Sequence, residues 1–239
     1  MLSPLKSVTG EPWVTVSDGA VLIYPYVEGK NGFEVRLEPE NWRSVGRTLR
    51  RVHEFKEARE VPNETFTVEG IDEFRATAIQ TPAQEVLCLH SEAVERCLQR
   101  VVELGARCLA KEWHHVPCHA DIHVGNILVR EDGPPFLVDW DAPKLAPKEC
   151  DLMFICGPGI TGHESEVEGW FFEGYGQCQI DPLALAYYRH VRAVEDIVSF
   201  TRESCDPSRT DESLRFLSGI FKPRQIVQTA DESYRLLSR

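Results

Sequence analysis

The sequence lacks a hydrophobic run long enough to cross a membrane. Its longest apolar stretch, residues 20–27, is interrupted by Pro25, whereas a membrane-spanning helix needs about 20 consecutive apolar residues. No apolar segment follows Met1, so we expect no secretory signal peptide. The eight cysteines form no C-x-x-C pair and are interpreted as reduced packing residues. These absences predict a cytoplasmic protein without a membrane partner.

Positive charge is also scarce. The 26 lysines and arginines are outnumbered by 38 acids, which gives a formal net charge of −12 at pH 7. Such a surface repels nucleic-acid phosphates and anionic lipids, so we expect neither as a partner. The same charge favours a cationic small molecule as substrate, although acidity is also a common means of staying soluble. With 239 residues, 42% of them apolar, the chain can form one large or two small hydrophobic cores.

The middle of the chain contains a polar loop followed by a short hairpin. Residues 118–129 read CHADIHVGNILV, and residues 136–141 read FLVDWD after a Gly-Pro-Pro turn. The hairpin is expected to bring Asp139 beside the loop. Phosphoryl transfer needs a carboxylate for the acceptor hydroxyl and oxygen ligands for a metal ion. Asp121, Asn126 and Asp139 offer these groups in that order.

This block resembles the catalytic centre of aminoglycoside phosphotransferases and related small-molecule kinases, and is most similar to that of spectinomycin phosphotransferases. The likeness is carried by the spacing H-x-D-x-x-x-x-N, the triplet D-W-D and the segment E-C-D-L, at residues 119–126, 139–141 and 149–152. The resemblance implies an α+β, protein-kinase-like fold with a mostly helical C-terminal lobe. The N-terminal β-sheet is expected to be truncated, because few residues precede Tyr24. The resemblance also implies ATP as co-substrate and Mg²⁺ as the metal.

The resemblance assigns roles to individual residues. Asp121 would be the catalytic base, and His119 would join it in the catalytic loop as an orienting residue that bonds the loop backbone. Asn126 and Asp139 would bind Mg²⁺. Asp151 would be a structural acid that braces the loop.

The resemblance also covers most of the remaining chain. Three segments are similar to the last small-lobe strand with the hinge, the first large-lobe helix and a late large-lobe helix, namely residues 20–29, 47–55 and 187–200. We therefore interpret residues 1–29 as a remnant of the small-lobe sheet with the hinge. Residues 30–239 are interpreted as the helical lobe that carries the catalytic loop.

The predicted hinge gives a weaker nucleotide signal. Backbone groups near Tyr24, Tyr26 and Val27 would contact the nucleotide, although Pro25 supplies no N–H donor. No G-x-G-x-x-G loop precedes Tyr24, and Lys6 has no strand pattern around it. The sequence is therefore expected to lack most of the phosphate-clamping lobe. The apolar surface that this leaves is expected to favour a homo-oligomer.

Apolar periodicity and turn residues predict the other elements. Two strands with a turn between them are expected at 13–16 and 20–24, and residues 60–82 are expected to form a loop with short helical pieces. Ser91 is a candidate helix cap. Helices are expected at residues 40–56, 91–113, 164–178, 182–204, 211–221 and 223–237.

A metal hydrolase is a competing interpretation of the same region. Residues suited to binding a metal are dense here, namely His114, His115, His119, Asp121 and His123. An H-x-D-x-H spacing places alternate ligands on one face of an extended strand. This interpretation leaves the loop amide and the D-W-D strand without a role.

Four further residues have both an ordinary and a functional interpretation. Cys118 adjoins His119 as a nucleophilic thiol would, but neighbours on an extended segment point to opposite sides, so packing is expected. Asp141, Glu195 and Asp196 are candidates for contact with a cationic substrate. A turn cap or a solvated helix face is the ordinary role for such acids.

The sequence thus favours an ATP-dependent phosphotransferase that acts on a hydroxyl group of a small, cationic molecule such as an aminoglycoside or aminocyclitol, as antibiotic-resistance enzymes do. The alternative is a catalytically impaired, kinase-like binding module that cannot hold ATP productively. The complete catalytic set favours the enzyme. The missing phosphate clamp favours the binding module, because charge stabilisation dominates phosphoryl transfer.

Overall fold

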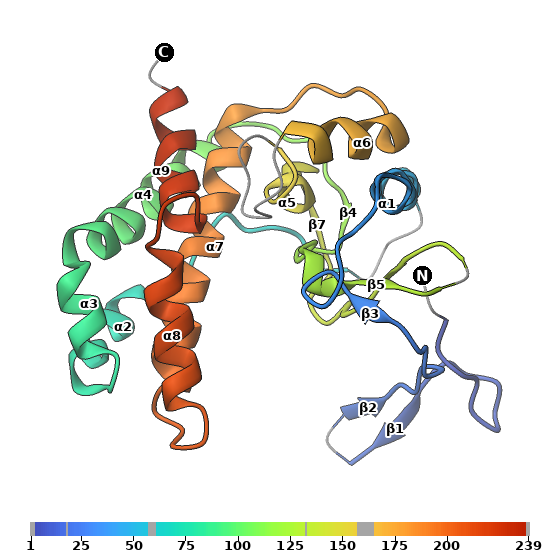
Figure 1. Cartoon of the computed structure of the whole chain (residues 1–239), viewed down its shortest axis with the longest axis horizontal. Helices are drawn as coiled ribbons and strands as arrows, with labels where there is room; N and C mark the ends of the chain where they lie inside the picture. The colour runs from blue at the N-terminus through green and yellow to red at the C-terminus, as the bar shows by residue number, and fades with distance from the viewer. Residues whose placement is uncertain (1–2, 18, 57–60, 132, 157–164, 238–239) are drawn as a thin grey trace.

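The computed structural model describes residues 3–17, 19–56, 61–131, 133–156 and 165–237 (Figure 1). Its helices are α1 (Pro39–His53), α2 (Ile71–Thr77), α3 (Gln84–Leu89), α4 (Ser91–Leu109), α5 (Glu149–Leu152), α6 (Ser165–Tyr175), α7 (Pro182–Glu203), α8 (Thr210–Ile220) and α9 (Ile226–Leu236). Its strands are β1 (Val14–Val16), β2 (Gly19–Val21), β3 (Lys30–Asn31), β4 (Val116–Cys118), β5 (Ile127–Val129), β6 (Phe136–Leu137) and β7 (Lys144–Ala146). Within these ranges, no helix is both long and apolar enough to cross a membrane.

The predicted long helices are present, and each of them ends earlier along the chain than the periodicity suggested. The prediction that Ser91 caps α4 is wrong, because His90 is the N-cap and Ser91 is the first helical residue. α4 stops at Leu109, and the Trp113 indole then donates to the carbonyl oxygen of Cys108 at 2.8 Å. α9 starts at Ile226, because Arg224 has a φ of 62° and cannot continue a right-handed helix.

The predicted hairpins β1–β2 and β5–β6 are both antiparallel pairs in the structure. The sequence did not reveal β3, which pairs with β5, or the pair β4–β7. It also did not reveal α3 and α5, which have six and four residues. Elements this short contain too few residues for a periodic signal. The strands β3 and β4 also pair with strands that are distant in sequence.

The hydrophobic residues form two cores, and the polar loop crosses from one to the other. One core lies among α2, α3, α4, α7, α8 and α9 and includes Cys118 at the end of β4. The other lies among α1, α6, β5 and β6 and includes Ile122, Val124 and Ile127. Residues 119–121 therefore bridge the two cores. The loop is held from both sides by apolar packing rather than left on the surface.

The second core depends on close approach of α1 and α6. Gly46 on α1 lies against the backbone of Phe171 and Tyr175, and Gly174 on α6 lies against the backbone of Arg43. A Cβ at either glycine would collide with backbone atoms, so only glycine permits this helix spacing. The contact fixes α1, which supplies His53 to the site described below.

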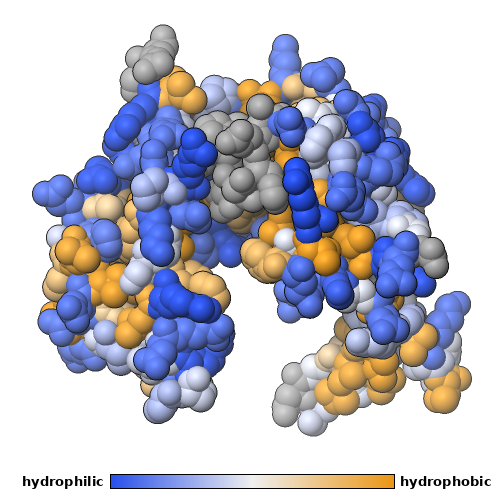
Figure 2. Space-filling view, viewed as in Figure 1, coloured by the Kyte–Doolittle hydropathy of each residue, from blue (hydrophilic) through white to orange (hydrophobic). Residues whose placement is uncertain are grey.

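The β1–β2 hairpin projects away from the helices (Figure 1), and every residue of both strands is exposed. An orange cluster marks it in the space-filling view (Figure 2). Its exposed apolar side chains are Trp13, Val14, Val16, Val21, Leu22 and Ile23.

Candidate active site

Asp151 holds the polar loop that begins at His119 through hydrogen bonds to its backbone. Its side chain is fully buried, and its two carboxylate oxygens accept the backbone N–H groups of His119 at 3.0 Å and Ala120 at 2.6 Å. His53 from α1 donates to the same carboxylate at 3.0 Å and is itself joined to the Tyr175 hydroxyl at 2.7 Å. Ala120 has a φ of 73°, a conformation that a non-glycine residue keeps only when its surroundings impose it. Asp151 supplies that constraint.

His119 connects the loop to the hairpin. Its Nε2 lies 2.8 Å from the carbonyl oxygen of Val138, and its Nδ1 accepts the backbone N–H of Asp121 at 3.3 Å. This pair of contacts requires the neutral tautomer with the proton on Nε2. The ring is 1% exposed and packs on Trp140 with a centroid separation of 4.3 Å. Both nitrogens are occupied, so the geometry suits an orienting residue rather than a base.

Asp121 is half-buried and contacts three side chains. The Arg192 guanidinium donates to Oδ1 at 2.7 Å, the Asn126 amide donates to Oδ2 at 3.3 Å, and His123 Nε2 lies 3.4 Å from Oδ2. The Asn126 amide also donates to the backbone oxygen of Asp121 at 3.0 Å. Burial works to raise the pKa of Asp121, but the His123 hydrogen bond and the Arg192 charge lower it below its usual value. The carboxylate is therefore ionised at neutral pH.

Asp139 follows β6 and is delivered beside the loop as the hairpin pattern predicted. The backbone N–H of Val138 donates to the carbonyl oxygen of Asn126 at 3.1 Å, which sets the two segments side by side. Asp139 has a φ of 65°, a left-handed conformation that aspartate tolerates better than most residues. Burial raises its pKa, and the neighbouring carboxylates of Asp141 and Asp121 raise it further. A cation bound here would stabilise the ionised forms of these neighbouring carboxylates.

A cavity of about 230 Å³ opens next to Asp139. Its lining residues are Tyr24, Leu137, Val138, Asp139, Trp140 and Asp141. Tyr24 comes from the predicted hinge, so the structure does bring part of that segment to the predicted metal ligand. Tyr26 is 92% exposed, and neither it nor Val27 lines this cavity. Of the three predicted nucleotide contacts, the structure places one at the site.

The two candidate acids on α7, Glu195 and Asp196, lie close enough to Asp121 to interact with its charge. Asp196 lies 2.9 Å from Nε of Arg192, whereas Glu195 is exposed. Partial desolvation raises the pKa of both acids, the Arg192 charge works against that rise, and the negative charge of Asp121 adds to it. These two candidates for substrate contact therefore share the electrostatic environment of Asp121.

Three residues of this environment were not among the predicted site residues. Arg192 contacts Asp121, Phe154 lies under Arg192, and His53 supports Asp151. The sequence signal for Arg192 was available, because it lies one turn before Asp196 on an amphipathic helix. Its partner Asp121 is 71 residues away, so the pairing itself had no sequence signal.

The alternative metal site is not assembled. Within the described ranges, the one group of three side chains placed to share a metal is His53, Cys118 and Asp151, and these already bond to other protein groups. His114 lines a separate cavity of about 460 Å³, and His115 packs on Phe66. The structure thus does not gather the predicted cluster of histidines.

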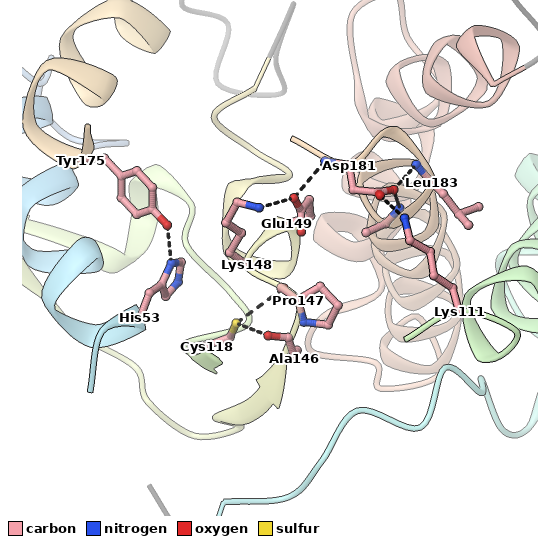
Figure 3. Close-up of polar contacts among 11 residues, drawn as sticks. His53, Lys111, Cys118, Ala146, Pro147, Lys148, Glu149, Tyr175, Asp181 and Leu183 are labelled. Carbon is pink, nitrogen blue, oxygen red and sulfur yellow. Dashed lines mark hydrogen bonds and ion pairs between the residues drawn. The ribbon is translucent and has the colours of Figure 1, made fainter. Parts of the chain in front are cut away.

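Cys118 is a packing residue, as expected. Its side chain is buried, and its thiol contacts the carbonyl oxygens of Ala146 and Pro147, each at 3.7 Å (Figure 3). Burial and the hydrogen bond to Cys150 raise the pKa of the Cys118 thiol well above its usual value. A thiol of this kind stays protonated and is a poor nucleophile.

The sequence matches the phosphotransferase enzyme family over residues 7–188. The chain belongs to that family. The match includes the whole loop, the hairpin with Asp139 and the segment with Asp151. The resemblance seen in the sequence is therefore confirmed. The search of curated proteins gave no match.

Solved structures show the same relationship. A spectinomycin phosphotransferase in complex with ADP and spectinomycin superposes with a TM-score of 0.84 at 27% identity, covering 98% of this chain and 78% of that one. Its AMP-bound complex gives a TM-score of 0.83 at 28% identity, covering 97% and 78%. An aminoglycoside phosphotransferase from Alicyclobacillus acidocaldarius gives a TM-score of 0.62 at 14% identity, covering 99% and 76%. The predicted α+β, kinase-like fold is thus confirmed.

The sequence contains a glycine spacing that the expectation of a missing phosphate loop did not include. The spacing G-x-G-x-x-G does occur once in this sequence, at residues 157–162. That segment follows the catalytic loop rather than preceding Tyr24, and it lies outside the described residues.

Proposed function

We propose that this chain transfers the γ-phosphate of ATP to a hydroxyl group of a small, cationic molecule such as an aminoglycoside or aminocyclitol. The observation that carries the proposal is the joint placement of Asp121, Asn126 and Asp139 on one loop and one adjoining hairpin. Membership of the phosphotransferase family supports phosphotransfer to a small molecule. The nucleotide, the metal and the acceptor class are parts of this proposal.

In this proposal Asp121 orients the acceptor hydroxyl and takes its proton. Its pKa is lowered, so at neutral pH it accepts a hydrogen bond from the hydroxyl rather than donating one. A weak base is sufficient, because the transition state of phosphoryl transfer is loose and needs alignment more than deprotonation. The contacts of His119 and Asn126 with the Asp121 backbone supply that alignment.

Asn126 and Asp139 are the proposed metal ligands. The Asn126 amide nitrogen is used by Asp121, which leaves the Asn126 side-chain oxygen for a metal ion. Asp139 repels Asp141 and Asp121, and a divalent cation would relieve that repulsion. Oxygen donors of this kind suit Mg²⁺, which is commonly held by one or two side chains together with substrate phosphates. When bound, Mg²⁺ would neutralise phosphate charge.

The cavity beside Tyr24 is the proposed nucleotide site. It adjoins Asp139, so a nucleotide there would present its phosphates to the proposed metal ligands. The spectinomycin phosphotransferase structures contain ADP and AMP, which supports a nucleotide co-substrate here. We place the protein in the cytoplasm, where ATP and Mg²⁺ are abundant, and its eight free cysteines are in keeping with that compartment.

A cationic acceptor is supported by the acids around Asp121. Glu195 and Asp196 lie on α7, Asp141 lies beside Asp139, and the whole chain carries a net charge of −12. Charge of one sign around a site raises the local concentration of an oppositely charged ligand. The spectinomycin bound by the similar phosphotransferase makes aminocyclitols the first acceptors to test. We propose no nucleic-acid or membrane partner.

A kinase-like binding module is the second candidate. The two lysines that precede α1, Lys6 and Lys30, are both exposed, so neither forms a closed phosphate clamp in this structure. A phosphate clamp stabilises charge mainly on the transferring phosphoryl group. Without such a clamp, turnover would therefore be affected more than binding of the acceptor.

Calorimetric titration with Mg-ATP, followed by a phosphate-transfer assay over aminocyclitols, aminoglycosides and simple amino alcohols, separates the two candidates. The enzyme proposal expects ATP binding and a phosphorylated product with at least one acceptor. Acceptor binding without any product would favour the binding module. No ATP binding at millimolar concentration would contradict the enzyme proposal for this chain.

A further inference from the structure

Arg192 makes the shortest side-chain contact with the Asp121 carboxylate. Its guanidinium donates to Oδ1 at 2.7 Å, whereas the contacts of Asn126 and His123 with Oδ2 are 3.3 and 3.4 Å long. A hydrogen bond between two charged groups at this distance is stronger than the longer contacts. Because one oxygen is held by Arg192 and the other by the loop, the carboxylate cannot rotate without breaking its best contact.

Arg192 is itself held in place by two other groups. Its Nε lies 2.9 Å from Asp196, one turn further along α7. Its guanidinium carbon lies 5.4 Å from the centroid of the Phe154 ring, which is 3% exposed. A guanidinium with a carboxylate beside it and an aromatic ring beneath it has little conformational freedom. The position of Arg192 is therefore determined before any substrate binds.

We infer that Arg192 is a positioning residue of the phosphotransfer reaction, which ties the Asp121 carboxylate to α7 and fixes the orientation in which Asp121 meets the acceptor hydroxyl. This inference rests on the proposed function. Oδ1 has one described donor, so it keeps a lone pair for the acceptor hydroxyl, and Arg192 sets the direction of that lone pair. Arg192 also lies between the charges of Asp121 and Asp196, because it contacts both carboxylates, and it offsets their mutual repulsion.

The first test compares Arg192→Met with Arg202→Met in the intact chain. Both substitutions remove one arginine from α7, and Arg202 is exposed near the end of the helix. We expect Arg192→Met to lower kcat by roughly 10- to 100-fold, as misplacement of a reacting group by about 1 Å does, while KM for ATP changes little. Arg202→Met should leave both constants unchanged. An unchanged kcat in Arg192→Met would overturn the inference.

Chemical rescue distinguishes positioning from general structural damage. Arg192→Ala should regain part of its lost kcat when guanidinium is added well below denaturing concentrations, whereas an equal concentration of sodium salt should have no effect. Arg192→Lys should retain more activity than Arg192→Met, because an ammonium keeps the charge but lacks the planar fork. A lack of rescue in a folded Arg192→Ala, with Arg192→Lys no better than Arg192→Met, would argue against positioning.

A crystal structure of Arg192→Met decides the point without any turnover. We expect the Asp121 carboxylate to leave its present orientation or to occupy more than one. An unmoved carboxylate would overturn the inference even if the proposed function stands. Absence of turnover in the unmodified chain would instead count against the proposed function, and the crystal structure would still decide the role of Arg192.

Discussion

The catalytic loop and the β1–β2 hairpin differ in how the protein holds them. The loop lies between two hydrophobic cores, and the fully buried Asp151 accepts the backbone N–H groups of His119 and Ala120. Every residue of the hairpin strands is exposed. The proposed acceptor side of the site is thus organised by buried packing, whereas Tyr24 of the proposed nucleotide side follows a hairpin whose strands are exposed. The predictions below test this contrast.

Removal of the loop's central acid should have the largest effect. Asp151→Asn replaces an oxygen acceptor with an NH₂ group that faces existing donors, so we expect a loss of about 3 kcal/mol in the free energy of unfolding, together with loss of phosphotransfer. Asp72, whose side chain is 99% exposed, gives the control Asp72→Ala, which should change stability by less than about 0.5 kcal/mol. Urea unfolding measures both. Equal midpoints for the two variants would contradict the bracing role.

The second test asks whether the helical core limits stability in acid. His190 on α7 is fully buried, and burial lowers its pKa from 6.5 to about 4. Between these pH values the unfolded chain binds a proton that the folded chain does not, so stability is lost as pH falls from about 6.5 towards about 4, by about 3 kcal/mol. His190→Phe should flatten the fall in melting temperature over that range. An identical pH dependence in both proteins would contradict the assignment.

The sequence predicted which candidate residues lie together better than it predicted the short strands and helices around them. The order and spacing of Asp121, Asn126 and Asp139 belong to one loop and one hairpin, so local pattern was enough to place them together. The β4–β7 pair and the contact between Arg192 and Asp121 join segments that are far apart in sequence. Such contacts depend on how the cores pack, and a single sequence carries no signal for them.

The third test concerns the packing that supports His53. Gly46→Ala would place a Cβ against the backbone of Phe171 and Tyr175, so we expect a loss of about 1–3 kcal/mol in the free energy of unfolding. Gly219 on α8 has no atoms near the position of an added Cβ. Gly219→Ala should therefore be neutral or stabilise by roughly 0.5–1 kcal/mol, because alanine is the better helix former. Similar effects of the two substitutions on thermal unfolding would contradict close packing of α1 against α6.

The smallest effects are expected in the segment that follows the hairpin. Tyr24 lines the cavity beside Asp139, whereas Tyr26 is 92% exposed. Tyr24→Ala should weaken Mg-ATP binding by about 1 kcal/mol, which is roughly fivefold in Kd, and Tyr26→Ala should leave it unchanged. Neither substitution should alter stability by more than about 0.5 kcal/mol. Calorimetry that finds equal ATP affinity for both variants would remove Tyr24 from the nucleotide site.

The exposed apolar side chains of the hairpin also test the contrast. Trp13, Val16 and Val21 are each close to half exposed, at 48%, 46% and 45%. Exposed apolar patches commonly mark contact surfaces, so we expect self-association through this hairpin. Sizing chromatography at micromolar concentration should show a species larger than the monomer, and Val16→Lys should shift it towards the monomer. A monomer in the unmodified chain would contradict this expectation.

The role proposed for Asp121 is tested most directly by phosphorylation of spectinomycin with Mg-ATP, measured by mass spectrometry for the intact chain and for Asp121→Asn. Asp206→Asn, at an exposed residue after α7, is the matched control. We expect a phosphorylated product with the unmodified chain and with Asp206→Asn, and a decrease of roughly 100-fold or more with a folded Asp121→Asn. Equal product from Asp121→Asn and the unmodified chain would contradict the central claim that Asp121 receives the acceptor hydroxyl.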